Sequence, residues 1–185
     1  MKKSAGFTLI ELMVVIAIAS VLMKLAAPSF KQLLQSNTIS SNVNNFLADM
    51  RYARSESVRR GGGVIMCRSD APEAASPVCG SGSGPGGNGW VSGWIIFIDL
   101  DGDGTRIASS TDPVLRVQAA ITAMDSIQEA NSTKFRFTAT GRLTLGGITS
   151  FEFGGGNYAG TVKRTVCVSV GGRARLAGDG YASCT

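Results

Sequence analysis

The feature that most constrains this 185-residue chain is an apolar run near its N-terminus, from Phe7 to Ala27. At about 1.5 Å per residue, a helix over this run would be roughly 31 Å long, close to the thickness of one hydrocarbon core. Lys2 and Lys3 precede the run, and the positive-inside rule keeps such an end in the cytoplasm. The sequence therefore predicts one transmembrane helix, with the rest of the chain across the membrane.

Two details of this run are unlike an ordinary secretory signal. The small residues Ser4-Ala5-Gly6 come before the apolar run, whereas a secretory signal carries them after it. Cleavage after Gly6 would remove the basic leader and leave the anchor attached. The second detail is Glu11, because a charged side chain at mid-bilayer costs about 2.5–3.5 kcal/mol on insertion scales.

The stretch GFTLIELMVVIAI resembles the prepilin-peptidase motif of type IV pilins and type II secretion pseudopilins. The resemblance implies cleavage by prepilin peptidase after Gly6, N-methylation of Phe7 and a helix kink at Pro28. In that family the residue matching Glu11 compensates the N-terminal amine of a neighbouring subunit during filament assembly. A carboxylate that meets a cationic amine loses much of its cost in lipid. The alternative is that Glu11 lies at the headgroup level of a signal anchor.

Beyond Pro28 the spacing of apolar residues by three and four predicts that the helix continues with one apolar face. The face is expected to include Phe30, Leu33, Leu34, Val43, Phe46, Leu47, Met50 and Ala53. Gly61 to Gly63 should end this helix. We thus divide the chain into a leader (1–6), a transmembrane helix (7–27), an amphipathic continuation (28–60) and a periplasmic β-rich domain (61–185).

The remainder has many glycines and short apolar runs, which favours strands joined by turns. The expected strands are Val64 to Cys67, Trp90 to Asp99, Val114 to Ala119, Lys134 to Thr138 paired with 142–145 about Gly141, Phe151 to Phe153, and Thr161 to Val170. The predicted class is α+β: a pilin-like fold in which the long N-terminal helix packs on an antiparallel β-sheet domain.

The four cysteines allow three pairings. An exported domain favours disulfides, and proximity favours Cys67 with Cys79 and Cys167 with Cys184. A zinc site is the alternative, although the chain lacks the C-x2-C pairs typical of one.

The segment Asp99-Leu-Asp-Gly-Asp-Gly104 matches the start of a calcium loop, with Asp99, Asp101 and Asp103 as candidate ligands. The twelfth position is Ser110 instead of Glu, and a strand precedes the loop, so a tight acidic turn is the favoured interpretation.

Other features argue against an enzyme. The chain has no histidine, which excludes Ser-His and Cys-His nucleophiles. The glycine-rich residues 80–89 lack GK[ST] and are not a P-loop. We expect no enzymatic activity and no cofactor.

Three further stretches, MRYARSESVRR, WVSGWIIFID and GGRARL, resemble minor pilins and pseudopilins of the GspH/FimT/FimU group. These are low-abundance subunits that initiate or cap a filament. In FimT-type members the arginines matching Arg173 and Arg175 are implicated in binding DNA during uptake. Lys163 and Arg164 lie nearby in sequence, which suggests a basic C-terminal patch on a chain of net charge +5. A solvated or subunit-contacting strand end is the alternative.

A second basic cluster comprises Arg51, Arg54, Arg59, Arg60 and Arg68. Arg59 and Arg60 fall at the expected helix end, where cations oppose the negative end of the helix dipole.

The sequence thus predicts a minor pilin or pseudopilin stored in the bacterial inner membrane and incorporated at the tip of a type IV pilus or a type II secretion pseudopilus. Its expected partners are other pilins or pseudopilins, prepilin peptidase and the inner membrane. The alternative function is binding of double-stranded DNA during natural transformation.

Overall fold

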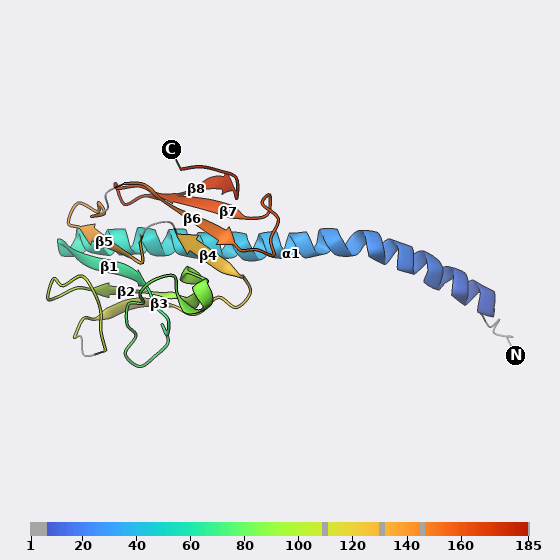
Figure 1. The fold of residues 1–185 in the computed structure, drawn as a ribbon, viewed down its shortest axis with the longest axis horizontal. Helices are drawn as coiled ribbons and strands as arrows, with labels where there is room; N and C mark the ends of the chain where they lie inside the picture. The colour runs from blue at the N-terminus through green and yellow to red at the C-terminus, as the bar shows by residue number, and fades with distance from the viewer. Residues whose placement is uncertain (1–6, 109–110, 130–131, 145–146, 185) are drawn as a thin grey trace, which may run out of the picture.

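A computed structural model describes residues 7–108, 111–129, 132–144 and 147–184. The leader, with Gly6, lies outside this part of the chain. Figure 1 shows one long helix, α1, whose C-terminal half lies among the strands while its N-terminal half projects away from them. The elements in chain order are α1 (Leu9–Arg60), β1 (Gly62–Arg68), η1 (Pro85–Gly87), η2 (Trp90–Ser92), β2 (Trp94–Ile98), β3 (Val114–Gln118), β4 (Ser126–Glu129), β5 (Lys134–Thr138), β6 (Thr149–Gly154), β7 (Arg164–Val168) and β8 (Ala174–Asp179).

Helix α1 is continuous from Leu9 to Arg60 and includes Pro28. It ends at Gly61, whose φ of 80° is left-handed and whose N–H donates to the carbonyl of Ser57. The Ser57 hydroxyl in turn donates to the carbonyls of Phe137 and Thr138, which fixes this helix end to β5. The projecting half curves away from the line of the other half in Figure 1.

The strands form two antiparallel four-stranded sheets. The first has the order β3-β2-β1-β5 and the second β4-β6-β7-β8. Both sheets turn one face toward α1, and alternate residues of their strands, such as Phe151 and Phe153 of β6, are fully buried there. The predicted fold class, a long N-terminal helix packed on antiparallel β-structure, is confirmed.

Phe46 of α1 lies at the centre of the core. Its ring contacts Trp90 and Trp94 edge-on at centroid distances of 6.0 and 5.6 Å, and Phe151 at 4.6 Å. These aromatic rings come from the helix, from the η2–β2 segment and from the second sheet. A single side chain therefore joins α1 to both sheets.

A smaller apolar cluster lies on the other face of the first sheet, where Ile65, Ile95 and Phe97 are buried. The disulfide between Cys67 and Cys79 holds the following loop over this face, with a Cα–Cα distance of 5.6 Å. Buried Arg106 anchors the same loop by donating to the carbonyls of Pro77 and Asp112.

The second disulfide joins Cys167 of β7 to Cys184, also with a Cα–Cα distance of 5.6 Å. It returns the C-terminal tail to the second sheet. Both bonds follow the pairing that proximity favours.

The expected strands differ from the structure at several points. The expected run Thr161 to Val170 is shortened to β7, Arg164–Val168. The run Trp90 to Asp99 is not one strand, because η2 occupies its start and Gly93, at φ 103°, turns the chain before β2. Residues after Gly141 make only a single bridge, Phe137 with Leu143, and residue 145 lies outside the described part. Strands β4 and β8 were not expected, since neither has a run of apolar residues.

Candidate functional site

The N-terminus of α1 carries a capping box that involves Glu11. The Glu11 N–H donates to Thr8 Oγ1 at 3.3 Å, and the Thr8 N–H donates to Glu11 Oε2 at 3.5 Å. This is the reciprocal pattern of a Thr-x-x-Glu sequence, which satisfies N–H groups that the first helical turn leaves unpaired. The local sequence Thr8-Leu-Ile-Glu11 is the signal for this cap, which was not among the expected features.

Among the described residues, the projecting half of α1 packs against nothing in the domain. Its described large apolar side chains are exposed, and α1 is long and apolar enough to cross a membrane. The exposure continues past Pro28, because Phe30, Leu33 and Leu34 are 61%, 56% and 53% exposed. Of the expected apolar face, the members from Val43 onward are buried against the domain, whereas the three before it are exposed.

Asp49 links the buried half of α1 to the first sheet. It is 3% exposed, accepts a hydrogen bond from Trp94 Nε1 at 2.8 Å and pairs with Arg116 of β3 at 3.0 Å. Burial raises the pKa of Asp49, while the Trp94 hydrogen bond and the Arg116 charge oppose that shift. The Arg116 guanidinium also lies 5.5 Å from the Tyr52 ring centroid.

The structure separates the four predicted DNA-binding residues into two pairs. Lys163 and Arg164 lie at the start of β7, where the Lys163 Nζ pairs with Glu152 at 2.8 Å. Arg164 Nη1 donates to the carbonyls of three neighbouring residues, Thr161, Val162 and Lys163. Arg173 and Arg175 lie beyond the other end of β7, in the β7–β8 turn and on β8, and both are exposed.

The acidic loop is organised as a turn. Asp99 Oδ1 accepts the Gly102 N–H, Asp101 Oδ1 the Asp103 N–H, and Asp103 Oδ1 the Thr105 N–H. Oxygen atoms of the three carboxylates lie within 4.8 Å of one another. Two cationic side chains of β5 already reach this loop: Arg136 pairs with Asp99, and Lys134 Nζ donates to the Gly104 carbonyl at 2.7 Å. These bonds support the acidic-turn interpretation.

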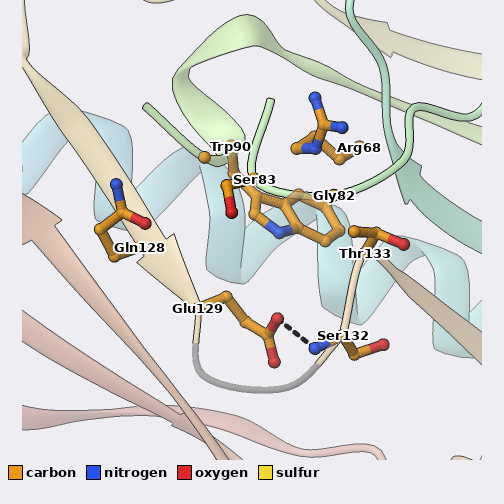
Figure 2. A pocket seen from close by; sticks show the side chains of 9 residues that line it. Arg68, Gly82, Ser83, Trp90, Gln128, Glu129, Ser132 and Thr133 are labelled. Carbon is orange, nitrogen blue, oxygen red and sulfur yellow. Dashed lines mark hydrogen bonds between the residues drawn. The ribbon is translucent and has the colours of Figure 1, made fainter. Parts of the chain in front are cut away.

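A pocket of about 380 Å³ lies in the β-domain, at a place for which the sequence gives no motif. Figure 2 shows the side chains that line it. The residues that line it come from the glycine-rich loop, η2, β4 and the segment before β5. Because these segments are far apart in the sequence, no local motif indicates the pocket. Glu129 accepts from the Ser132 N–H and from the Thr149 hydroxyl. The buried Arg68 side chain pairs with Asp70 and donates to the Ser81 carbonyl. The charged side chains that line the pocket, Arg68 and Glu129, are thus already bonded to other parts of the domain.

Comparison with protein families gives two matches. Residues 42–172 match the family described as type II transport protein GspH, and residues 1–23 match the prokaryotic N-terminal methylation motif. A comparison with curated proteins found no match.

Two crystal structures of the type IV minor pilin FimU from Pseudomonas aeruginosa have a similar fold. For one, the TM-score is 0.57 at 20% identity, covering 80% of this chain and 95% of the FimU chain. For a second crystal form, the TM-score is 0.54 at 20% identity, covering 79% and 98%. At this identity the likeness establishes the fold.

A methylation motif at the start of an unpartnered apolar helix, followed by this β-domain, defines the class: the protein is a minor pilin or pseudopilin, a structural subunit anchored by its N-terminal helix. Because the family match spans more than half of the chain, the protein belongs to the GspH family. This confirms the resemblance seen in the sequence, and it implies assembly with other subunits of the pilin class.

Proposed function

We propose that this protein is stored in the bacterial inner membrane with residues 61–185 in the periplasm, and that it joins the tip of a type IV pilus or a type II secretion pseudopilus. Prepilin peptidase cleaves it after Gly6, and the new N-terminal Phe7 is N-methylated. One observation carries the proposal: the large apolar side chains of α1 that the structure describes between Phe7 and Leu34 are exposed, so this half fits both a bilayer and the core of a filament.

The assembly step depends on Glu11. In the free subunit Glu11 completes the capping box with Thr8. In the filament its carboxylate meets the N-terminal amine of a neighbouring subunit. An ion pair of this kind offsets the cost of leaving a carboxylate in an apolar environment. Enzymatic activity forms no part of this proposal, because the chain has no histidine and the GspH family consists of structural pilin subunits.

The two roles of Glu11 can be separated by substitution. Glu11→Gln keeps an acceptor for the capping box, which tolerates Glu or Gln at this position, but removes the charge. Thr8→Ala removes the cap and keeps the charge. We expect Glu11→Gln to remain in the membrane fraction and to be absent from isolated filaments, while Thr8→Ala is incorporated. Incorporation of Glu11→Gln at the wild-type level would refute the docking role.

A second candidate function is binding of double-stranded DNA through Arg173 and Arg175. The observation that favours it is their exposure at the β7–β8 turn and on β8, away from the engaged Lys163 and Arg164. Guanidinium groups bind phosphate through two parallel hydrogen bonds. Titration of the full chain with duplex DNA should show binding that weakens steeply with salt and is lost in Arg173→Gln/Arg175→Gln.

A further inference from the structure

Three segments that are distant in sequence meet at one place: the C-terminal part of α1, the turn after β5 and the β7–β8 turn. The turn after β5 packs on the helix so closely that a Cβ at Gly141 would lie 2.8 Å from Arg54 Nε and 3.0 Å from Val58 Cγ2. The β7–β8 turn packs on the turn after β5: the Leu143 N–H donates to the Val170 carbonyl at 2.8 Å, and a Cβ at Gly172 would clash with the Gly141 carbonyl. Both glycines have left-handed φ values of 72°.

Each of these three segments carries an arginine at the junction. Arg54 lies on α1, Arg142 directly follows Gly141, and Arg173 directly follows Gly172. Arg142 and Arg173 are exposed, and Arg54 is half-buried. Within the part of the chain that the structure describes, Arg142 and Arg173 make hydrogen bonds through their backbone, but none of the three guanidinium groups has a hydrogen bond or an ion pair. We call this set, Arg54, Arg142 and Arg173, the arginine junction.

The nearest carboxylate on the same helix does not neutralise the junction. Glu56 is bonded to Arg59 at 2.6 Å and to Arg60 at 2.8 Å, and these bonds lower the pKa of Glu56. Because like charges without partners add their potentials, the junction favours an anionic ligand.

Lipid phosphates of the anchoring membrane are out of reach. From Ala27, where the predicted transmembrane segment ends, to Arg54 the helix rises by roughly 40 Å at about 1.5 Å per residue. The ligand must therefore approach from the aqueous side.

We propose that Arg54 and Arg142 extend the Arg173 element into one phosphate-binding surface, and that its ligand is the backbone of duplex DNA. This inference rests on the second candidate function above and adds two residues to its site. Surface contacts to single phosphates are weak, and affinity grows with the number of phosphates neutralised. Three arginines fixed on packed segments provide such a set, whereas Lys163 and Arg164 are engaged in contacts inside the domain.

The test is a titration of the full chain, held in a zwitterionic detergent, with a fluorescent DNA duplex between about 50 and about 200 mM salt. The wild type is compared with Arg54→Gln/Arg142→Gln and with Lys163→Gln/Arg164→Gln, which removes the same charge at the far end of β7. Each lost phosphate contact lowers the slope of log affinity against log salt by about 1. We expect a loss of about 2 for the first variant and little change for the second.

The outcomes separate the inference from the function on which it rests. If Arg173→Gln/Arg175→Gln loses binding while Arg54→Gln/Arg142→Gln keeps the wild-type slope, the function stands and the inference is wrong. If both two-charge variants lose equally, net charge explains binding and the inference also fails. If the wild type does not bind, the second candidate function fails as well. Arg54→Lys/Arg142→Lys keeps both charges and should keep the slope, which guards against loss by misfolding.

Discussion

At the scale of single residues, two carboxylates on α1 occupy opposite environments. Glu11 is exposed at the free end of the helix, where it caps the first turn. Asp49 is buried at the other end, between Trp94 and Arg116. In our proposal the first meets a partner outside the chain, whereas the second joins the helix to its own domain.

The raised pKa of Asp49 predicts that the stability of the domain depends on pH. The carboxyl of Asp49 binds its proton more tightly in the folded state than in the unfolded state, so protonation of Asp49 stabilises the fold. This contribution to the free energy of unfolding is fully present below the unfolded pKa of about 3.9 and is lost as pH rises through the folded pKa. Asp49→Asn keeps an acceptor for Trp94 but cannot titrate. Its stability relative to the wild type should therefore rise as pH increases over this window.

Thermal unfolding followed by near-UV circular dichroism, at several pH values from about 4 to about 7, measures this difference. Arg116→Gln, which keeps the titrating carboxylate, serves as the control. A constant difference between Asp49→Asn and the wild type across the range would show that Asp49 does not titrate there.

The methylation motif at the helix start was recognisable because it is local: Gly6, Phe7 and Glu11 lie within a few positions of one another, and residues 1–23 match the motif. The roles of the three residues stay predictions. The arginine junction was not predictable. In the sequence, Arg54 is one of several cations near the end of a helix. Its proximity to Arg142 and Arg173 follows only from the packing of the Gly141 and Gly172 turns.

At the scale of elements, α1 is divided into a half that packs on the sheets and a half that does not. Two phenylalanines test this division. Phe46→Ala should destabilise the domain by about 3–5 kcal/mol, because it leaves a cavity among Trp90, Trp94 and Phe151. Phe30→Ala on the exposed half should change domain stability by no more than about 0.5 kcal/mol. Equal losses in thermal unfolding would contradict the division.

The loop after β1 depends on its disulfide. Replacing both Cys67 and Cys79 by Ser should cost about 3 kcal/mol and free the loop from the buried face formed by Ile65 and Phe97. Limited proteolysis should then cleave between the two positions much faster than in the wild type. Cys167→Ser/Cys184→Ser should leave this loop protected, since that bond restrains the C-terminal tail on the other sheet. Equal protection of the loop in both variants would mean that other contacts hold it.

The elements that the sequence predicted best have strong apolar periodicity, as in α1 and in β7 with Val166 and Val168. Strand β8, with the sequence ARLAGD, has little apolar character because it lies at the edge of its sheet and pairs only with β7. Strand β4 is short and lies at the opposite edge. Because the side chains of edge strands are less buried, their sequences show a weaker apolar pattern and are harder to recognise as strands.

At the scale of the whole molecule, the domain holds one end of α1 and leaves the other exposed. The exposed half is suited to lipid before assembly and to other helices after it. The core around Phe46 contains no residue of the projecting half. The domain can therefore keep its fold when that half moves from lipid to contacts with other helices. The fold class followed from the sequence, whereas the two-sheet arrangement and the extent of the exposed helix required the structure.

The most direct test of the account is the mass of the N-terminal peptide of the mature protein, purified from the membranes of cells that produce it. The account predicts a peptide that begins at Phe7 and carries one N-methyl group, with the apolar helix still attached. A chain that begins at Met1, or one cleaved beyond Ala27 so that the helix is lost, would contradict the proposal that this protein is processed as a pilin subunit.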